Sequence, residues 1–344
     1  MFEILPLSSD KVSRFDKFVL DESINGTFLQ TNRFLSYHPK DRFKDASFIL
    51  HKSGVIVAYF TGVVTEDGCW VSHKGTTFGG PIISRDYYSA SRMMQIIETA
   101  DCYLKTNFKS VRMKPTGHIF CTQPTDLLEY ALEHFGYERR SELSCFTDLE
   151  GESDVLEICT SERRYDYRKA CRCPISYHSL QTNKEFEDFY KHLLISKQKY
   201  HTKPVHTLEE LHTLQNLFPD EVLFRGVFLP AEGEQMVCEN FIKNNSAEEE
   251  LAEIYLSGVM IFNFKQTKVW HLQYVAPNED YHNMNATTVL NIEVLREAKA
   301  NGIKKFSWGI STEDGGKILN ENLYKFKESF GAKPCVNTCW TKHF

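Results

Sequence analysis

Lys327 is the residue whose setting most invites a chemical role. It stands in the segment YKFKESFG (324–331), which predicts the last turns of an amphipathic helix. The apolar stripe of this helix recurs at spacings of four, three and four residues: Leu319, Leu323, Phe326 and Phe330. Lys327 falls about 75° from the centre of that stripe, at the edge of the packed face, where its ammonium can reach a cleft. The alternative is a surface lysine that lays its stem on apolar surface.

Arg163 and Tyr167 form a second candidate pair in the segment SERRYDYRKACR (161–172). They lie one helical turn apart, so their side chains face the same way. This segment holds five basic and two acidic residues and predicts a helix. An arginine and a tyrosine on one face can bind an anion, and so can the next pair, Arg164 and Arg168. The alternative is a charged linker helix whose arginines pair with nearby acids.

Aromatic residues of the second half could also line a binding site. Tyr274 and Trp308 stand in two predicted strands, 268–276 and 304–308, and such residues belong to a core more often than to a ligand platform. Tyr274 is the stronger of these two candidates. His271 and His282 have no acidic or hydroxyl partner that the sequence identifies, so neither is predicted to be a catalytic base.

Length and composition restrict the class of protein that can carry these residues. A chain of 344 residues with 42% hydrophobic content is expected to form two globular domains. The net charge of −6 argues against a general DNA-binding protein. Ten cysteines lack the paired C-x-x-C spacing of a zinc site, so no metal is predicted. With neither a signal peptide nor a long apolar run, the sequence predicts a cytoplasmic protein with no membrane span.

The chain repeats itself at a nearly constant offset. VAYFTGVV (57–64) resembles EIYLSGVM (253–260), with Gly62 matching Gly258 at an offset of 196. LEYALEHFG (128–136) resembles LYKFKESFG (323–331) at an offset of 195, which places Phe135 over Phe330. Between them, residues 97–111 lie over residues 292–306 at the same offset of 195. Three matches in order predict a duplicated domain. Lys327 matches Leu132, so only the second copy has this lysine.

Each copy shows the same order of elements: strand, strand, helix, strand, helix, strand. The longer helices are expected at 87–106 and 286–301, and the polar run 238–250 is expected to form a loop. This order predicts an α/β fold with a mixed sheet and helices on both faces. We place the first domain at 1–155, a basic linker helix at 156–175, and a second domain, which carries Lys327, at 176–344.

Four segments carry a resemblance to a known family. They are TFLQTNRFL (27–35), SERRYDYRKA (161–170), GIKKFSWG (302–309) and YKFKESFG (324–331). In this order they resemble segments of the FemAB/FemX aminoacyltransferases and their wider acyltransferase relatives. The resemblance covers nearly the whole chain. It implies two tandem acetyltransferase-like (GNAT) domains, in agreement with the duplication.

The resemblance also implies a reaction. An amine on a bacterial cell-envelope or glycan precursor attacks an activated acyl group and forms an amide, without a metal, a covalent enzyme intermediate or a tightly bound cofactor. The donor would be aminoacyl-tRNA or acyl-CoA, and the acceptor a small molecule or a nucleotide- or lipid-linked glycan. The basic excess of residues 296–344, nine basic against five acidic residues, could help to hold tRNA.

The same resemblance assigns roles to individual residues. Ser161, Arg163 and Tyr167 follow the family's acceptor-phosphate pattern, Thr/Ser-x-Arg-x-x-x-Tyr. Phe326 and Lys327 match its Phe-Lys motif, in which the lysine stabilises negative charge on the reacting acyl oxygen or on a phosphate beside it.

Two departures from the family pattern leave other functions open. The turn expected to cradle the pyrophosphate of CoA, PNEDYHNMNA (277–286), has no glycine and carries two acids. His38 stands near the place of a lysine that the family has after its Gln-Ser/Thr segment. The alternatives to an aminoacyltransferase are a non-catalytic protein that binds an anionic glycan or peptide, and a plain CoA-dependent N-acetyltransferase.

Overall fold

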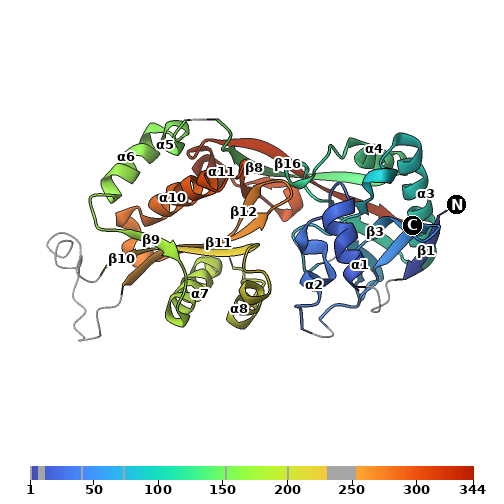
Figure 1. Cartoon of the computed structure of the whole chain (residues 1–344), viewed down its shortest axis with the longest axis horizontal. Helices are drawn as coiled ribbons and strands as arrows, with labels where there is room; N and C mark the ends of the chain where they lie inside the picture. Colours follow the sequence, from blue (N-terminus) through green and yellow to red (C-terminus); the bar gives the residue numbers. More distant parts are fainter. Residues whose placement is uncertain are drawn as a thin grey trace.

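A computed structural model describes residues 2–6, 12–39, 42–72, 74–151, 153–199, 201–230 and 253–344. The predicted loop at 238–250 lies outside the described residues. The chain forms two α/β halves that lie side by side, and both termini lie in the N-terminal half (Figure 1). In the described part of the chain, no helix is long and apolar enough to cross a membrane.

The N-terminal half contains two sheets and two longer helices. Its strands are β1 (Glu3–Pro6), β2 (Phe48–Lys52), β3 (Val55–Phe60), β4 (Gly62–Val64), β5 (Cys69–Ser72), β6 (Ile82–Ile83), β7 (Ser110–Met113) and β8 (Glu138–Asp148). Its helices are α1 (Val12–Lys17), α2 (Asn32–Leu35), α3 (Ala90–Asn107) and α4 (Asp126–His134), with short η turns that include η3 (Phe28–Gln30). Strands β1, β2, β3 and β6 form a four-stranded sheet of their own.

The C-terminal half begins with the linker helices and continues the main sheet. Its strands are β9 (Ser176–Ser179), β10 (Val222–Leu229), β11 (Ile254–Phe264), β12 (Val269–Pro277), β13 (Lys305–Ile310), the hairpin β14–β15 (Thr312–Glu313 and Ile318–Leu319) and β16 (Ala332–His343). Its helices are α5 (Val155–Ile158), α6 (Ser161–Ala170), α7 (Asn183–Gln198), α8 (Leu208–Leu217), α10 (Ala286–Ala300) and α11 (Glu321–Glu328), with η7 (Glu279–Met284) before α10.

Helices cover both faces of the sheet in the C-terminal half, as the sequence predicts. On one face α7 and α8 bury apolar side chains such as Phe189 and Leu214 (Figure 1). On the other face α10 buries Leu290 and Leu295. Helix α6 lies on the same face, and so does the ring of Phe330, which follows α11. The sheet is mixed, because β5–β7 and β12–β13 are parallel while its other neighbouring strands are antiparallel. The prediction of an α/β mixed-sheet fold is confirmed.

The strand register confirms the duplication. In the first half Trp70 of β5 pairs with Val111 of β7, and in the second half Trp270 of β12 pairs with Phe306 of β13. The two β-strand partners, Val111 and Phe306, differ by 195 residues, the offset seen in the sequence. Helices α4 and α11 begin at residues 126 and 321, again 195 apart. Both helices are followed by a glycine with positive φ, Gly136 and Gly331, which ends them in the left-handed conformation.

The last strands of the two halves have exchanged places. β8, the last strand of the N-terminal half, pairs with β13, and β16, the last strand of the chain, pairs with β7. β8 and β16 also pair with each other, from Glu138–Thr341 to Thr147–Ala332. One ten-stranded sheet therefore crosses both halves in the order β4-β5-β7-β16-β8-β13-β12-β11-β10-β9. The domain limits at 155 and 175 stay predictions, because the two copies share this sheet.

We expect Gly62→Ala to lower the free energy of unfolding by about 1–3 kcal/mol, the usual cost of overfilling a packed core. A Cβ at this position would lie 2.2 Å from Cε2 of Trp70, which is fully buried. Gly258→Ala is the matched variant in the second copy, and it should cost less because its closest contact, at 2.7 Å, is the tip of the Tyr255 side chain. Urea unfolding measures both. An unchanged midpoint for Gly62→Ala would contradict this packing.

Candidate active site

The parallel strands β12 and β13 separate in the middle of the C-terminal half. They are paired only from Val269–Lys305 to His271–Ser307, although β12 continues to Pro277 and β13 to Ile310. Beyond His271 the two strands therefore diverge and leave an opening in the sheet. Backbone groups of diverging strands no longer bond to each other and need other partners, and at the end of β13 the carbonyls of Gly309 and Ile310 accept from Lys327.

A β-bulge lies at the start of this opening. Met260 of β11 pairs with Tyr274 of β12, and Ile261 pairs with Leu272, so Gln273 stands between two pairs without a partner of its own in β11. A bulge disrupts the ladder locally and redirects a side chain, and bulges are common next to active sites. The bulge at Gln273 directs that side chain into a cavity.

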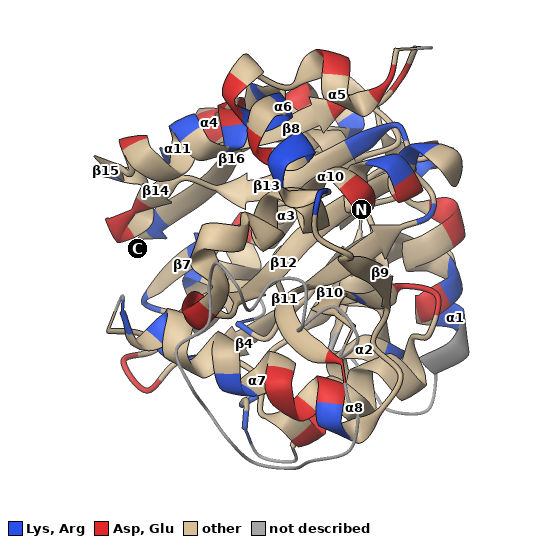
Figure 2. Cartoon of the chain, turned by 90° about the vertical axis from the view of Figure 1, so that its left-hand side faces the viewer, with Lys and Arg blue, Asp and Glu red and all other residues tan. Residues whose placement is uncertain are grey.

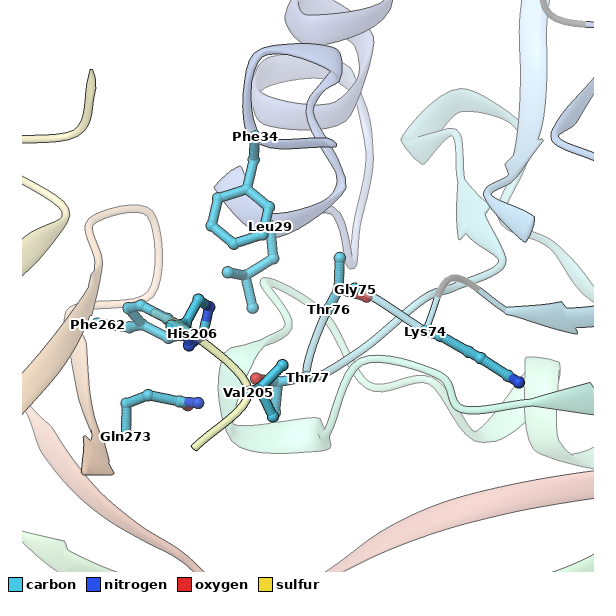
Figure 3. A pocket seen from close by; sticks show the side chains of 10 residues that line it. All are labelled: Leu29, Phe34, Lys74, Gly75, Thr76, Thr77, Val205, His206, Phe262 and Gln273. Atoms are coloured by element: carbon cyan, nitrogen blue, oxygen red, sulfur yellow. The ribbon is translucent and has the colours of Figure 1, made fainter. Parts of the chain in front are cut away.

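The cavity has a volume of about 190 Å³ and is built by both halves of the chain (Figure 3). The N-terminal half contributes residues of η3, α2 and the loop after β5, and the C-terminal half contributes residues of β11, β12 and the loop before α8. The lining residues are Leu29, Phe34, Lys74, Gly75, Thr76, Thr77, Val205, His206, Phe262 and Gln273. Figure 3 shows Gln273, His206 and Thr77 grouped together, whereas the side chain of Lys74 points away from the others.

His206 links the two halves at the wall of the cavity. Its Nδ1 lies 2.8 Å from the hydroxyl of Tyr274 on β12, and its Nε2 lies 2.9 Å from the hydroxyl of Tyr37 in the N-terminal half. Burial lowers the pKa of His206 to about 4, so the ring is neutral at pH 7 and donates one of these hydrogen bonds while accepting the other. The wall of the cavity is therefore fixed by an uncharged hydrogen-bond chain.

Lys327 is buried, at 4% exposure, rather than lying at the edge of a packed face. Its ammonium donates three hydrogen bonds, to the carbonyls of Gly309 (3.0 Å) and Ile310 (2.7 Å) and to Oγ of Ser311 (2.9 Å). These acceptors form the end of β13, on one side of the opening in the sheet. Burial lowers the pKa of Lys327 to about 8.

The predicted apolar stripe around Lys327 is wrong at its first two positions. Leu319 and Leu323 are 47% and 39% exposed, and only the end of the stripe, Phe330, is fully buried. The helix begins at Glu321, because the side chain of Asn320 accepts a hydrogen bond from the backbone N–H of Leu323 and caps it. Leu319 therefore belongs to β15, and the short helix contacts the sheet through its last turn.

His271 lies where β12 and β13 part. Its Nδ1 is 3.0 Å from Oγ of Ser307, and burial together with the charges of Lys327 and Lys114 lowers the pKa of His271 to about 3. The structure thus supplies a hydroxyl partner that the sequence does not identify, although a neutral imidazole with so low a pKa is a weak base. His282 is exposed on η7, with Nδ1 3.0 Å from the carbonyl oxygen of Glu279.

Arg163 and Tyr167 join α6 to α10 in this structure. Arg163 donates hydrogen bonds to Asp166 (3.0 Å) and to Thr288 of α10 (3.2 Å). The Tyr167 hydroxyl contacts Glu293 and accepts from Arg296, both on α10. Ser161 is exposed in the first turn of α6, a helix that carries both acidic and basic residues (Figure 2). Acceptor binding by these residues stays a prediction, and any acceptor has to compete with the contacts between the helices.

The remaining predicted residues fall on opposite faces of the sheet. Phe326 and Trp308 both contact the ring of Phe330, edge-on and tilted respectively, at centroid distances of 5.2 Å, on the face that carries α10. The Arg163 guanidinium lies 5.6 Å from the centroid of the Phe326 ring, and Lys327 follows Phe326 on α11. This group therefore contains four of the seven predicted residues: Arg163, Trp308, Phe326 and Lys327. Trp308 is a core residue whose indole donates to Thr147 (2.8 Å), and it offers no surface to a ligand. Tyr274 lies on the other face, at the cavity.

The comparisons place this architecture among known folds. No protein-family model matches the sequence, and no curated protein is detectably similar to it. The crystal structure of FemX is similar over 99% of this chain and 97% of its own, with a TM-score of 0.71 at 11% identity. The chain has the tandem GNAT fold. Two more structures share the tandem GNAT fold, the C-terminal domain of a putative lysylphosphatidylglycerol synthetase from Agrobacterium fabrum and a tandem GNAT protein of clavulanic acid biosynthesis. The first has a TM-score of 0.58 at 10% identity and covers 97% of this chain and 91% of its own. The second has a TM-score of 0.54 at 9% identity and covers 100% of this chain and 98% of its own.

Sequence reasoning misses the cavity, since none of the residues that line it is among the seven predicted site residues. Gln273 and His206 carry no local pattern, since a bulge and a contact across 169 residues leave no spacing in the sequence. The only usable signal is the predicted strand 268–276, which led to Tyr274. Among the described residues, no group of three or more histidines, cysteines or acids gathers as a metal site.

Proposed function

We propose that this chain is an acyltransferase that forms an amide on an amine acceptor at the opening between β12 and β13. The observation that carries the proposal is the cavity at Gln273, because it brings the bulge of β12 in the second copy together with residues of the first copy. A site built by both halves can hold a donor and an acceptor side by side, which is the main requirement of such a transfer. The finer proposal, from the resemblance to FemX, is an acceptor among cell-envelope or glycan precursors.

The reaction needs little from the protein beyond position and charge. The amine nitrogen attacks the acyl carbon, a C–N bond forms, and the C–O or C–S bond to the donor breaks. The amine loses a proton as the leaving group gains one. Negative charge develops on the acyl oxygen, and hydrogen-bond donors near the bulge would stabilise it. Gln273 supplies an amide at the cavity, and Lys327 supplies the positive charge at the end of β13.

Lys327 has two parts in this proposal. Its ammonium fixes the backbone from Gly309 to Ser311, where Gly309 takes a positive φ of 72°, and so holds one wall of the opening. Its charge also favours an anionic oxygen nearby. The first copy has the fully buried Leu132 at the matching position, so its own opening lacks this charge. Transfer is therefore assigned to the second copy alone.

We expect acetyl-CoA to bind weakly, with a dissociation constant well above the micromolar range. The turn before α10 reaches the left-handed conformation through Asn285 (φ 54°), whose Cβ occupies space that a glycine would leave to a pyrophosphate. Glu279 and Asp280 in the same turn add negative charge, although Glu279 is paired with Lys199 at 2.7 Å. Titration calorimetry measures the constant, and micromolar binding would instead favour a plain CoA-dependent N-acetyltransferase.

A ligand screen followed by a transfer assay tests the function. Thermal shifts are measured with acetyl-CoA, longer acyl-CoAs, UDP-sugars and aminoacyl-tRNA, and each donor that binds is incubated with each acceptor that binds. Amide formation, followed by mass spectrometry, supports the proposal. Binding of a glycan or peptide without any donor and without amide formation would support the non-catalytic alternative.

A further inference from the structure

Lys197 continues the buried stripe of α7. Phe186, Phe189 and Leu193 are buried against the sheet, and Lys197 follows at a spacing of four residues, on the same face of the helix. The lysine is half-buried over β12, and its Nζ lies 5.6 Å from the centroid of the Tyr274 ring. A charged side chain thus occupies a position where the pattern of the helix requires an apolar one.

No described residue neutralises this ammonium. Lys197 makes no hydrogen bond or ion pair through its side chain with any residue that the structure describes. Two carboxylates of neighbouring elements are already paired with other residues, Glu279 with Lys199 and Glu210 with Arg42, both at 2.7 Å. Burial without a compensating anion lowers the pKa of Lys197. Tyr274 offers only a cation–π contact, which compensates a small part of the lost hydration.

The position of Tyr274 connects this lysine to the cavity. The Tyr274 hydroxyl contacts His206 at 2.8 Å and accepts from the backbone N–H of Val205 at 3.3 Å, and both residues line the cavity. Tyr274 also follows Gln273 directly in β12. The ammonium therefore lies over the ring whose hydroxyl contacts His206 in the wall of the cavity, one residue removed from the lining.

We propose that Lys197 is an anion-binding residue for a substrate that occupies the cavity, and that it binds a carboxylate or phosphate group of that substrate. An anion would supply the missing charge partner and form a charge-assisted hydrogen bond. A single ammonium acts as a point charge and suits either group, whereas a guanidinium would select for a planar, bidentate one. The identity of the substrate rests on the proposed function, whereas the binding of the anion by Lys197 does not.

Chemical labelling of the lysines in the whole protein tests this without any transfer assay. Trace acetic anhydride is applied with increasing inorganic phosphate or succinate at constant ionic strength, and peptide mass spectrometry gives the labelling rate of each lysine. Lys199 is the internal control, because it lies two residues away, is exposed and is paired with Glu279. At ten times the dissociation constant, the bound anion should slow the labelling of Lys197 about tenfold and leave Lys199 nearly unchanged.

The two probes also identify the group. Saturable protection of Lys197 by phosphate alone indicates a phosphorylated substrate, and protection by succinate indicates a carboxylate. If neither anion protects Lys197 beyond the change at Lys199, the proposal is wrong and the lysine only covers Tyr274. If the transfer assay fails while an anion still protects Lys197 from labelling, the proposed function is wrong and the anion site is supported.

A variant gives a second measurement. Lys197→Met removes an unpaired charge and keeps an unbranched stem, so without anion it should raise the Tm by about 1–3 °C. Phosphate or succinate, whichever protects, should raise the Tm of the wild-type protein and not that of Lys197→Met. Lys199→Met should keep the response to the anion. A Tm of Lys197→Met that still responds like the wild type would contradict the assignment.

Discussion

Replacing Lys327 with methionine is expected to lower turnover by about 10²-fold, because it removes the positive charge of the buried ammonium and releases the backbone from Gly309 to Ser311 that the ammonium holds in place. The structure adds a cost in stability that the position of the residue in the sequence does not predict. The substitution leaves two backbone carbonyls and the Ser311 hydroxyl without their buried donor, so we expect the free energy of unfolding to fall by about 1–3 kcal/mol. Turnover is measured well below the Tm of the variant with the donor and acceptor that the screen identifies.

Lys325→Met is the matched control for this substitution. Lys325 lies on the same helix but is exposed, and it contacts only Glu321, at 3.6 Å. Its replacement should change the free energy of unfolding by less than about 0.5 kcal/mol and leave turnover unchanged. Equal turnover of the two variants would show that Lys327 serves the packing of the C-terminal half alone.

The pH dependence of turnover gives a further measure of the same prediction. Because burial lowers the pKa of Lys327 to about 8, the side chain is an ammonium with three donors below that pH and an amine with two above it. Turnover should therefore fall above pH 8. Between pH 8 and the ordinary lysine pKa near 10.5, the unfolded chain binds more protons at this residue than the folded chain, so its contribution to stability rises with pH. A loss of turnover without a loss of stability separates chemistry from unfolding.

Filling the cavity with an indole is expected to abolish transfer by a different route. Thr77 lines the cavity beside Val205, so Thr77→Trp should occupy the space in which donor and acceptor meet (Figure 3). Misplacing a reacting group by about 1 Å can cost 10²-fold, and we expect a loss of at least that size in kcat/KM. The ligand that normally enters the cavity should bind more weakly by thermal shift.

Lys105→Trp adds the same indole to an exposed position of α3, in the same half of the chain and outside the cavity lining. This variant should keep both binding and transfer. Full activity of Thr77→Trp would place the reaction elsewhere and would remove the main support of the proposed function. Circular dichroism of both variants shows that the comparison is made between folded proteins.

The duplicated fold could be predicted from the sequence because it rests on local signals repeated at one distance. Gly136 and Gly331 end matching helices, and the offset between them is also the offset between Val111 and Phe306 in the sheet. The exchange of β8 and β16 could not be predicted. The alternation of side chains in a strand indicates which face is buried, and it is the same whichever strand lies alongside.

The candidate site could be predicted only in part, since its residues meet through long-range contacts. The Phe-Lys motif directs attention to Lys327, but the burial of its ammonium depends on the backbone at Gly309 to Ser311. His206 contacts Tyr37 and Tyr274, which lie 169 and 68 residues away. Neither separation follows the period of a helix or a strand, so no sequence pattern predicts these contacts. Only Tyr274 was expected at the cavity, through the strand that carries it.

The exchanged strands have a consequence for synthesis on the ribosome. β7 finds its neighbour in β16, whose residues 332–343 are translated more than two hundred residues later. The N-terminal half therefore has an open sheet edge throughout translation and cannot complete its main sheet as an independent unit. Contacts of such long separation form slowly and leave unpaired edges open to other chains in the meantime. The two halves fold to completion together, and separate expression of either one would leave β7 or β13 without the strand that borders it here.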